Sequence, residues 1–220
     1  MNSREKNKQP WPTKDAMQQI YELNLWGGED GNFYSGLGSH DKAIVEPYIE
    51  VVKVFLNSLD VPVTIVDLGC GDFNVGKELV THSQTYIAVD IVPELIERNR
   101  EKFILENLSF QCLDIAKDEL PIGDVALVRQ VLQHLSNAEV KQVVEKLDQY
   151  QYVILTEHLP EGEFEPNVDI ISGQGIRLKK GSGLDLIQTP FEFKAKVIKK
   201  LLSIPYPDGI GVIVTTLFGL

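Results

Sequence analysis

Three acidic residues end three apolar segments of the chain, in a pattern that suits a nucleoside ligand. Asp67 ends the segment 63–67 and is followed by Gly69 and Gly71, Asp90 ends the segment 84–90, and Asp114 ends the segment 108–114. If these segments are parallel strands, their carboxyl ends meet at one edge of a sheet. There glycines let the backbone approach a ligand, and helix N-termini offer free amides. A carboxylate at the end of the second segment can accept hydrogen bonds from both hydroxyls of a ribose. The sequence therefore predicts a nucleoside-shaped site.

The rest of the chain has the elements that such a site needs. Strand-like apolar runs alternate with helical patterns, which indicates a parallel α/β sheet with right-handed crossovers. Two closing strands joined by a hairpin follow a segment from 159 to 190 that reads as loops. The predicted strands are 63–67, 84–90, 108–114, 124–130, 152–158, 194–204 and 211–218, and the predicted helices between them are 76–83, 93–105 and 137–150.

The first 60 residues have a different character. A helix is predicted from a cap at Thr13 or Asp15 to about Leu25, and another over 41–58. Between them, residues 26–40 hold five glycines and three aromatic residues. Glycine at this density indicates unusual backbone angles or close approach to another group. We therefore expect an N-terminal helical segment, residues 1–60, that carries a loop, and one compact domain over residues 61–220.

Composition excludes several classes of protein. The 220 residues carry 21 basic and 32 acidic side chains, a net charge of −11 that argues against a nucleic-acid partner. Seven basic residues against two acids lie in 177–200, which we interpret as a solvated face rather than a phosphate site. No apolar run approaches the ~20 residues of a membrane span, and no secretory signal is evident. With only Cys70 and Cys112 present and no metal-ligand spacing, we predict a cytoplasmic protein without disulfides, metal or membrane contact.

Four segments in order resemble motifs I to IV of the class I S-adenosylmethionine-dependent methyltransferases. They are DLGCG, VDI, CLDI and ALVRQVLQHLS, and the resemblance covers roughly residues 61–158. It implies a seven-stranded, mostly parallel sheet with helices on both faces and a reversed C-terminal strand, preceded by the N-terminal helices. It also implies S-adenosylmethionine as the cofactor. The sequence departs from the family at Phe73, where many members have a third glycine.

The resemblance assigns cofactor roles along the chain. Asp67, with Gly69 and Gly71, would line the methionine end, and Asp67 would hold the ammonium. Asp90 would bind the ribose and Asp114 the adenine amino group. Ile91 and Ile115 would pack against the adenine. Arg129 and Gln130 would lie beside the methionine part and the transferable methyl. Glycine spacing at 69–76 differs from the G-x-G-x-x-G pattern of dinucleotide sites, which disfavours an oxidoreductase.

Residues around the acceptor are less clearly indicated. His134 and His158 follow the fourth and fifth predicted strands, and each is a candidate base or substrate contact, or else a rim residue. The segment 26–40 is predicted to be a lid in which Tyr34 or Ser39 reaches the cofactor carboxylate and Trp26 lies nearby, with a plain surface loop as the alternative. The insertion 159–191 would select the substrate, with Asn167, Asp169 and Arg177 as its polar candidates.

The function that the resemblance implies is transfer of a methyl group to a small-molecule acceptor by in-line displacement. Such a reaction needs proximity, orientation and exclusion of water, and a general base only where the nucleophile must lose a proton. Two alternatives stay open at this point: a protein methyltransferase, and a non-catalytic protein that binds S-adenosylmethionine. The atom that is methylated and the oligomeric state are not indicated by the sequence.

Overall fold

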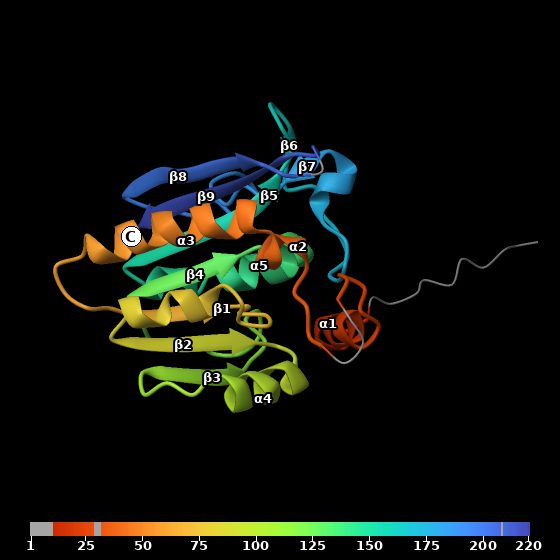
Figure 1. The fold of residues 1–220 in the computed structure, drawn as a ribbon. Coiled ribbons are helices and arrows are strands. Elements are labelled where there is room, and N and C mark those ends of the chain that lie inside the picture. Colours follow the sequence, from red (N-terminus) through yellow and green to blue (C-terminus); the bar gives the residue numbers. More distant parts are fainter. Residues whose placement is uncertain (1–10, 29–31, 208) are drawn as a thin grey trace, which may run out of the picture.

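One mixed sheet organises the chain (Figure 1). Within residues 11–28, 32–207 and 209–220, which the computed structural model describes, seven strands form this sheet in the order β3-β2-β1-β4-β5-β9-β8. β1 pairs in parallel with both β2 and β4, so the chain reverses its winding between them. β9 runs antiparallel to β5 and to β8. The predicted seven-stranded α/β sheet with a reversed C-terminal strand is therefore confirmed. Its strands are β1 (Thr64–Leu68), β2 (Thr85–Asp90), β3 (Leu108–Cys112), β4 (Val125–Arg129), β5 (Tyr152–Leu159), β8 (Val197–Pro205) and β9 (Val212–Gly219).

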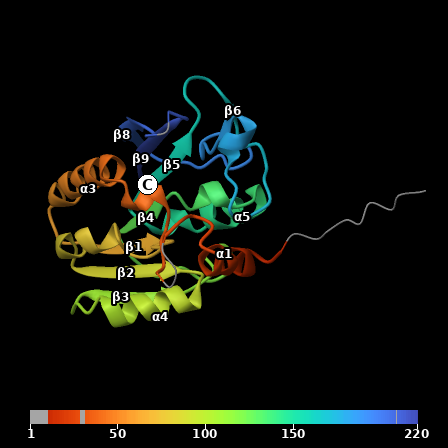
Figure 2. The ribbon, with the colours of Figure 1, turned by 45° about the vertical axis from the view of Figure 1, so that its right-hand side comes forward.

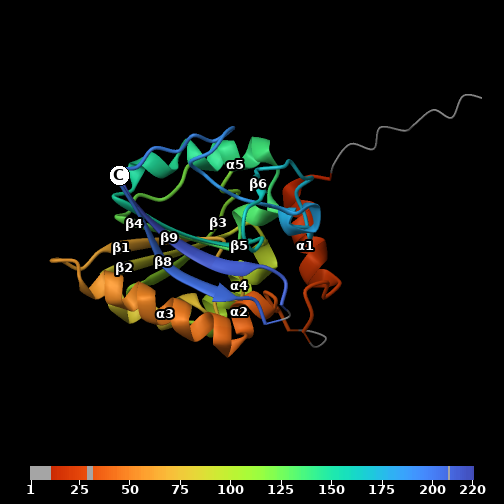
Figure 3. The same ribbon diagram turned by 90° about the horizontal axis from the view of Figure 1, so that it is seen from above.

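Helices cover both faces of the sheet, as the view from above shows (Figure 3). Alternate residues of β1 point to opposite sides, so Ile65 joins the core beneath α3 while Val66 joins the core beneath α5. α1 lies at the end of the sheet toward which the parallel strands point (Figure 1). The helices are α1 (Thr13–Glu22), α2 (Leu37–His40), α3 (Lys42–Asn57), α4 (Pro93–Lys102) and α5 (Asn137–Val144).

Several predicted helices are shorter than expected. α1 ends at Glu22, and Pro12 precedes it without a side-chain cap, whereas a longer helix capped by Thr13 or Asp15 was predicted. The predicted helix 76–83 is wrong, because that segment forms two single 3-10 turns. The last predicted helix stops at Val144. Isolated 3-10 turns have fewer and poorer hydrogen bonds than α-helices, so they occur where packing interrupts a helix. The turns are η1 (Gly76–Glu78), η2 (Val80–His82), η3 (Leu132–His134), η4 (Leu147–Gln149) and η5 (Arg177–Lys180).

The N-terminal helices are packed onto the sheet. Met17 and Ile20 of α1 are buried in the same core as α5, and Asp41 caps α3 by accepting a hydrogen bond from the backbone amide of Ala43. α2 is a short helix inside the glycine-rich segment that the sequence did not indicate; Figure 2 shows it near α3, in front of the strands. The division of the chain at residue 60 stays a prediction, and its residues 1–10 and 29–31 lie outside the described part.

The insertion between β5 and β8 contains little regular structure. A two-stranded ladder of β6 (Glu165–Pro166) and β7 (Ser182–Gly183) and the turn η5 are its regular elements in the described residues. β8 forms one edge of the main sheet, and most of its nine residues are exposed. A register shift between Lys200 and Leu202 breaks the regularity of that edge.

Candidate functional site

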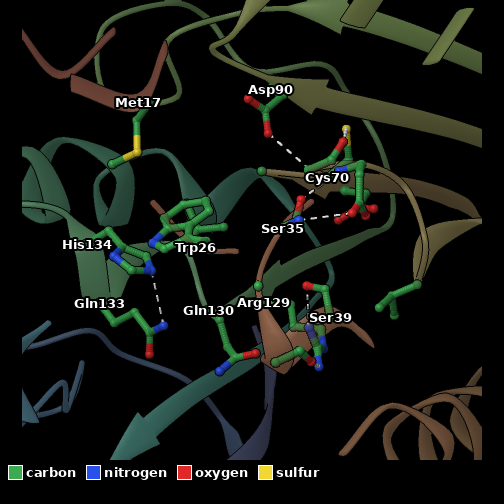
Figure 4. Close-up of a pocket in the computed structure, with 18 of the residues that line it drawn as sticks. Met17, Trp26, Ser35, Ser39, Cys70, Asp90, Arg129, Gln130, Gln133 and His134 are labelled. Carbon is green, nitrogen blue, oxygen red and sulfur yellow. Dashed lines mark hydrogen bonds between the residues drawn. The ribbon is translucent and has the colours of Figure 1, made fainter. Parts of the chain in front are cut away.

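A cavity of about 410 Å³ opens at the carboxyl ends of the parallel strands, beside the point where the winding reverses. This is the position at which open α/β sheets bind ligands. Met17 of α1, with Ser35 and Ser39 of the segment before α3, lies at the cavity (Figure 4), and the insertion also contributes lining residues. Most of the residues predicted from the sequence line it: Trp26, Ser39, Asp67, Gly69, Gly71, Asp90, Ile91, Asp114, Ile115, Arg129, Gln130, His134 and His158.

The turn after β1 has a backbone that only small residues tolerate. Gly69 and Gly71 have φ angles of 86° and 55°, in the left-handed region. A side chain on Gly69 would clash with Val131, and one on Gly71 with the hydroxyl of Ser35. The glycines therefore let the strand end pass closely beneath the neighbouring segments, and the cavity forms at that point.

Phe73 shows how this chain manages without the third glycine. Its φ angle is 62°, a conformation that disfavours a bulky side chain, yet its ring is fully buried. The ring makes edge contacts with Tyr86, Phe103 and Phe110 at centroid distances of 5.6, 5.1 and 4.9 Å. Burial of an aromatic side chain in this cluster offsets backbone strain on the order of 1–3 kcal/mol. The loop thus keeps the left-handed turn that glycine would supply.

Asp90 and Asp114 are held in place by neighbouring groups. One oxygen of Asp90 accepts a hydrogen bond from the amide of Gly71 at 3.0 Å, and the other accepts from the amide of Val92 at 3.1 Å. Burial raises the pKa of Asp90, against the lowering effect of these amides. Asp114 accepts from the amide of Ala116 and pairs with Lys117 at 2.8 Å. Each carboxylate has further lone pairs with which to accept hydrogen bonds from a ligand.

Asp67 and Arg129 form the buried polar centre of the site. Burial raises the pKa of Asp67 to about 7, although the hydrogen bond from Tyr86 and the nearby Arg129 guanidinium lower it. Arg129 donates to the carbonyl of Gly38 and lies over the ring of Tyr48, 4.9 Å from its centroid. Its Nε is buried without a hydrogen-bond partner in the part of the chain that the structure describes. An ionised Asp67 suits a ligand cation, and the positive charge of Arg129, which lines the cavity, suits a ligand carboxylate.

The lid segment, residues 26–40, is bonded to the residue that follows the glycine turn. One oxygen of Asp72 accepts from the amide of Ser35 at 2.9 Å and from His40 Nε2 at 2.5 Å. The amide of Asp72 in turn donates to the hydroxyl of Ser35, which also bonds to Tyr21 of α1. Ser35 lies at the cavity in Figure 4. Bonds to Asp72, together with those from Arg129 and Asn74 to Gly38 and Ser39, thus hold this segment against the cavity.

The three residues predicted for this segment have different positions. Trp26 lines the cavity with its ring 5.0 Å from that of His134, and Ser39 lines it while accepting a hydrogen bond from Arg129. Tyr34 does not reach the cavity, because its ring stacks on His40 at 4.2 Å. Ser35, which the sequence did not single out, occupies the position beside Gly71.

His134 is a neutral ring with a defined tautomer. Its Nδ1 donates to the carbonyl of Gly173 at 3.2 Å, since a carbonyl can only accept. Its Nε2 therefore carries the lone pair and accepts from the side-chain amide of Gln133 at 3.3 Å (Figure 4). Burial lowers the pKa of this imidazole to about 4. A histidine in this state is a weak base at neutral pH.

His158 is tied to the hairpin between β8 and β9. Its Nε2 donates to the carbonyl of Ile210 at 2.6 Å, and its ring stacks on Tyr206 at 4.3 Å. Both His158 and Tyr206 line the cavity. The hairpin thus forms a wall of the site.

The polar candidates of the insertion have structural roles, which corrects the sequence-based interpretation. Arg177 is 1% exposed and donates to the carbonyls of Leu132 and Leu135 and to the side chain of Asn137. Asn167 and Asp169 bond to neighbouring backbone groups, with Asp169 accepting from the amide of Asn137. None of these three lines the cavity. The insertion instead contributes Gln174, Ile176 and Lys179.

Other lining residues gave little signal in the sequence. Met17 and Tyr21 belong to the apolar stripe of α1, which reads as a core-facing pattern, and Tyr206 belongs to a turn. Among the described residues there is no group of three or more His, Cys, Asp or Glu side chains arranged to hold a metal ion. Cys70 lines the cavity as a half-buried free thiol whose pKa is raised by desolvation. A search of the described helices for one that is long and apolar enough to span a membrane found none.

Comparisons with known proteins agree with this geometry. Residues 66–150 match the family model described as a methyltransferase domain. Phosphoethanolamine N-methyltransferase 1 of Triticum aestivum is 28% identical over 90 residues, which are 38% of this chain and only 18% of that longer protein.

Two solved structures resemble nearly the whole chain. The N-methyltransferase NodS of Bradyrhizobium japonicum, solved with S-adenosyl-L-homocysteine, superposes with a TM-score of 0.68 at 13% identity over 93% of this chain and 98% of that one. The 1,6-didemethyltoxoflavin-N1-methyltransferase of Burkholderia thailandensis gives 0.59 at 14% identity over 91% of this chain and 84% of that one. The chain therefore has the Rossmann-like fold of class I S-adenosylmethionine-dependent methyltransferases, as its motifs implied.

Proposed function

We propose that this chain is an S-adenosylmethionine-dependent methyltransferase that acts on a small molecule. The observation that carries the proposal is the cavity itself, into which three successive strand ends place Asp67, Asp90 and Asp114 around a glycine turn. S-adenosylmethionine supplies a methyl group on a cationic sulfonium, which becomes a neutral thioether after transfer. A cavity lined by several acidic residues and by Arg129 fits a ligand with two cationic groups and one carboxylate.

Each residue has a role that follows from its surroundings. Asp90, oriented by the amides of Gly71 and Val92, accepts from two ribose hydroxyls. Asp67 faces the amino-acid end, where a ligand ammonium lowers the pKa of its carboxyl from about 7 and keeps it ionised. Arg129 lines the cavity and supplies the positive charge that favours the ligand carboxylate.

The adenine end lies between β2, β3 and the segment after β4. Ile91 and Ile115 provide apolar walls, and Asp114 has lone pairs for an amino group. Gln130, with a φ angle of 55°, is turned toward the centre of the cavity beside Gly38 of the lid segment. The lid segment and α1 keep water from the centre, which favours orientation and charge stabilisation as sources of rate.

A small-molecule acceptor is favoured by the shape of the site. The cavity volume of about 410 Å³ lies in the range of small-molecule pockets, and the insertion and the β8–β9 hairpin contribute side chains to its wall. The relatives also act on small molecules by their names, phosphoethanolamine and 1,6-didemethyltoxoflavin. A protein substrate would require a longer exposed channel.

Calorimetric titration tests the cofactor assignment. Purified protein is titrated with S-adenosylmethionine, S-adenosylhomocysteine and NADH, and the titrations are repeated with Asp90→Asn. We expect both adenosyl ligands to bind and NADH not to bind. The variant should lose about 100-fold in affinity, because a charge-assisted pair of hydrogen bonds is removed. The matched control is Asp148→Asn, an exposed acid on η4 outside the cavity. Absence of adenosyl-ligand binding to the folded wild type would refute the proposal.

A further inference from the structure

We propose that the acceptor is a planar aromatic or heteroaromatic molecule that presents a nitrogen with its lone pair already free, and that His134 positions this molecule instead of deprotonating it. The inference rests on the methyltransferase function proposed above and narrows its substrate class. It comes from the part of the cavity that the cofactor residues do not form. Side chains of η3, the end of β5, the insertion and the β8–β9 hairpin make up this acceptor end.

The hydrogen bonds of the acceptor end fix which atoms can donate and which can accept. The backbone amide of His158 donates to Oε1 of Gln133 at 3.0 Å, so Nε2 of Gln133 must face His134. The side-chain amide of Gln133 donates to Nε2 of His134, while Nδ1 of the same ring donates to the carbonyl of Gly173. Both nitrogens of His134 are therefore engaged, and its lone pair is held by a donor.

The second histidine is also unsuited to removing a proton through Nε2. That atom carries the proton that it donates to Ile210. The charged group that acts on the His134 ring is the guanidinium of Arg177, which lowers the pKa further in the same direction as burial. A proton on His134 would meet that positive charge and lose its acceptor role toward Gln133. The geometry thus disfavours a base at His134 and at Nε2 of His158.

The walls of the acceptor end are flat rings. Trp26 lies over His134 at a centroid distance of 5.0 Å, and Tyr206 stacks on His158 at 4.3 Å. Gln133 connects the two ring pairs, since it bonds to His134 by its side chain and to the backbone of His158. Aromatic walls bind planar molecules by offset stacking, which supplies about 0.5–1.5 kcal/mol per ring pair beyond burial.

Charge distinguishes the acceptor end from the cofactor end. The acidic residues that line the cavity, in the described chain, are Asp67, Asp72, Asp90 and Asp114, which lie at the carboxyl ends of β1, β2 and β3 or in the loops just after them. Toward η5 the cavity is lined instead by Lys179. An alkylammonium there would be partly desolvated without a carboxylate to pair with, and this is costly. A neutral or anionic ring avoids that cost.

The chemistry balances without a base. The nitrogen lone pair forms the new N–C bond as the C–S bond breaks, and the electrons of the C–S bond stay on sulfur. The nitrogen becomes cationic as the sulfonium becomes neutral, so total charge is conserved. If the nitrogen carried a hydrogen, the methylated cation then loses it to water, because its own acidity has risen.

A panel of simple amines tests the substrate class. Methyl transfer from labelled S-adenosylmethionine is measured with aniline and benzimidazole, and with benzylamine and phosphoethanolamine as charged alkyl comparisons. We expect kcat/KM for the aryl probes to exceed that for the alkyl probes by at least about tenfold. With S-adenosylmethionine saturating, the rate should show no dependence on a histidine that titrates between about pH 6 and 9. A preference for either alkyl probe, or no transfer to the aryl probes by protein that binds S-adenosylmethionine, overturns the inference. Failure to bind the cofactor would instead refute the proposed function.

Two measurements test the role of His134. Nitrogen-15 NMR of the imidazole in the S-adenosylhomocysteine complex should show a neutral ring with the proton on Nδ1 down to about pH 5. In His134→Asn the new amide can still donate to Gly173, and we expect a raised KM with kcat reduced less than about tenfold, whereas loss of a general base costs about 100-fold or more. His82→Asn, on η2 away from the cavity, is the matched control. Titration of His134 near neutral pH, or a loss of kcat as large as that of a base, contradicts the positioning role.

Discussion

The two ends of the cavity are built in different ways. At the cofactor end, Asp90 is oriented by amides of Gly71 and Val92, which belong to the loops directly after β1 and β2. At the acceptor end, His134 is oriented by Gly173, 39 residues away, and His158 by Ile210, 52 residues away. The cofactor end therefore depends on local backbone geometry, and the acceptor end on contacts between distant segments. Substitutions in the contacts that hold the acceptor end should therefore change the free energy of unfolding, whereas substitutions at the cofactor end should change cofactor affinity.

The largest expected effect concerns Arg177, which fastens the insertion to the turn that carries Gln133 and His134. Arg177→Met leaves the carbonyls of Leu132 and Leu135 without this buried donor and removes the positive charge near Glu157. We expect the free energy of unfolding to fall by about 3–5 kcal/mol, measured by urea denaturation. Lys196→Met, an exposed lysine, should change it by less than about 0.5 kcal/mol. Equal stability of the two variants would show that the insertion does not depend on this arginine.

The next effect is a pH dependence that arises at Glu157. Burial raises the pKa of this carboxyl from 4.5 to about 8, so the folded state binds a proton that the unfolded state has released between these values. The stabilising contribution of this carboxyl is therefore full at the acidic end of this window and is lost as the pH rises through it. Glu157→Gln lacks this titration, so the stability of the wild type relative to the variant, measured by denaturation at several pH values, should fall as the pH rises. A stability difference between the two that stays constant or grows in favour of the wild type would contradict the prediction.

A smaller effect is expected where the lid segment meets the glycine turn. Ser35→Ala removes the hydroxyl that accepts from the amide of Asp72 and bonds to Tyr21. We expect S-adenosylhomocysteine to bind about tenfold more weakly in calorimetry, because one buried hydrogen-bond network is broken. Ser58→Ala, at the exposed end of α3, is the control and should bind normally. Unchanged affinity in Ser35→Ala would separate lid closure from cofactor binding.

The smallest effect is expected at Tyr34, which the sequence suggested as a cofactor contact. Because its ring stacks on His40 away from the cavity, Tyr34→Leu should weaken cofactor binding by less than about threefold. The same calorimetric titration measures it. A loss as large as that of Ser35→Ala would indicate that Tyr34 moves to the ligand on closure.

What the sequence predicted correctly depends on local pattern. The apolar strands and the acids at their ends, such as Asp67 and Asp90, are defined by a few neighbouring residues, and so is the glycine turn. The helix predicted at 76–83 was wrong, since this segment forms two 3-10 turns, and a side chain on Gly76 would clash with Phe73 and Asp67. No single-residue propensity describes such close packing.

The acceptor end was harder to predict because its signals are ordinary ones. Tyr206 looks like part of a turn, and Gln133 like a helix residue. Arg177 was expected to contact substrate because charged residues are usually exposed, yet it is buried with backbone carbonyls as its partners. Only the fold brings β5, the insertion and the hairpin together, so these roles could not be predicted from spacing.

The exposed edge strand β8 has a consequence for how the protein behaves at high concentration. An open edge offers unpaired backbone groups to which another chain can add a strand. Here Lys199 and Lys200 stand exposed on that edge, the register is broken next to them, and the strand ends at Pro205. Repulsion between lysines, an irregular edge and a terminal proline are each known to discourage strand addition. The basic stretch near the C-terminus thus guards the sheet against aggregation.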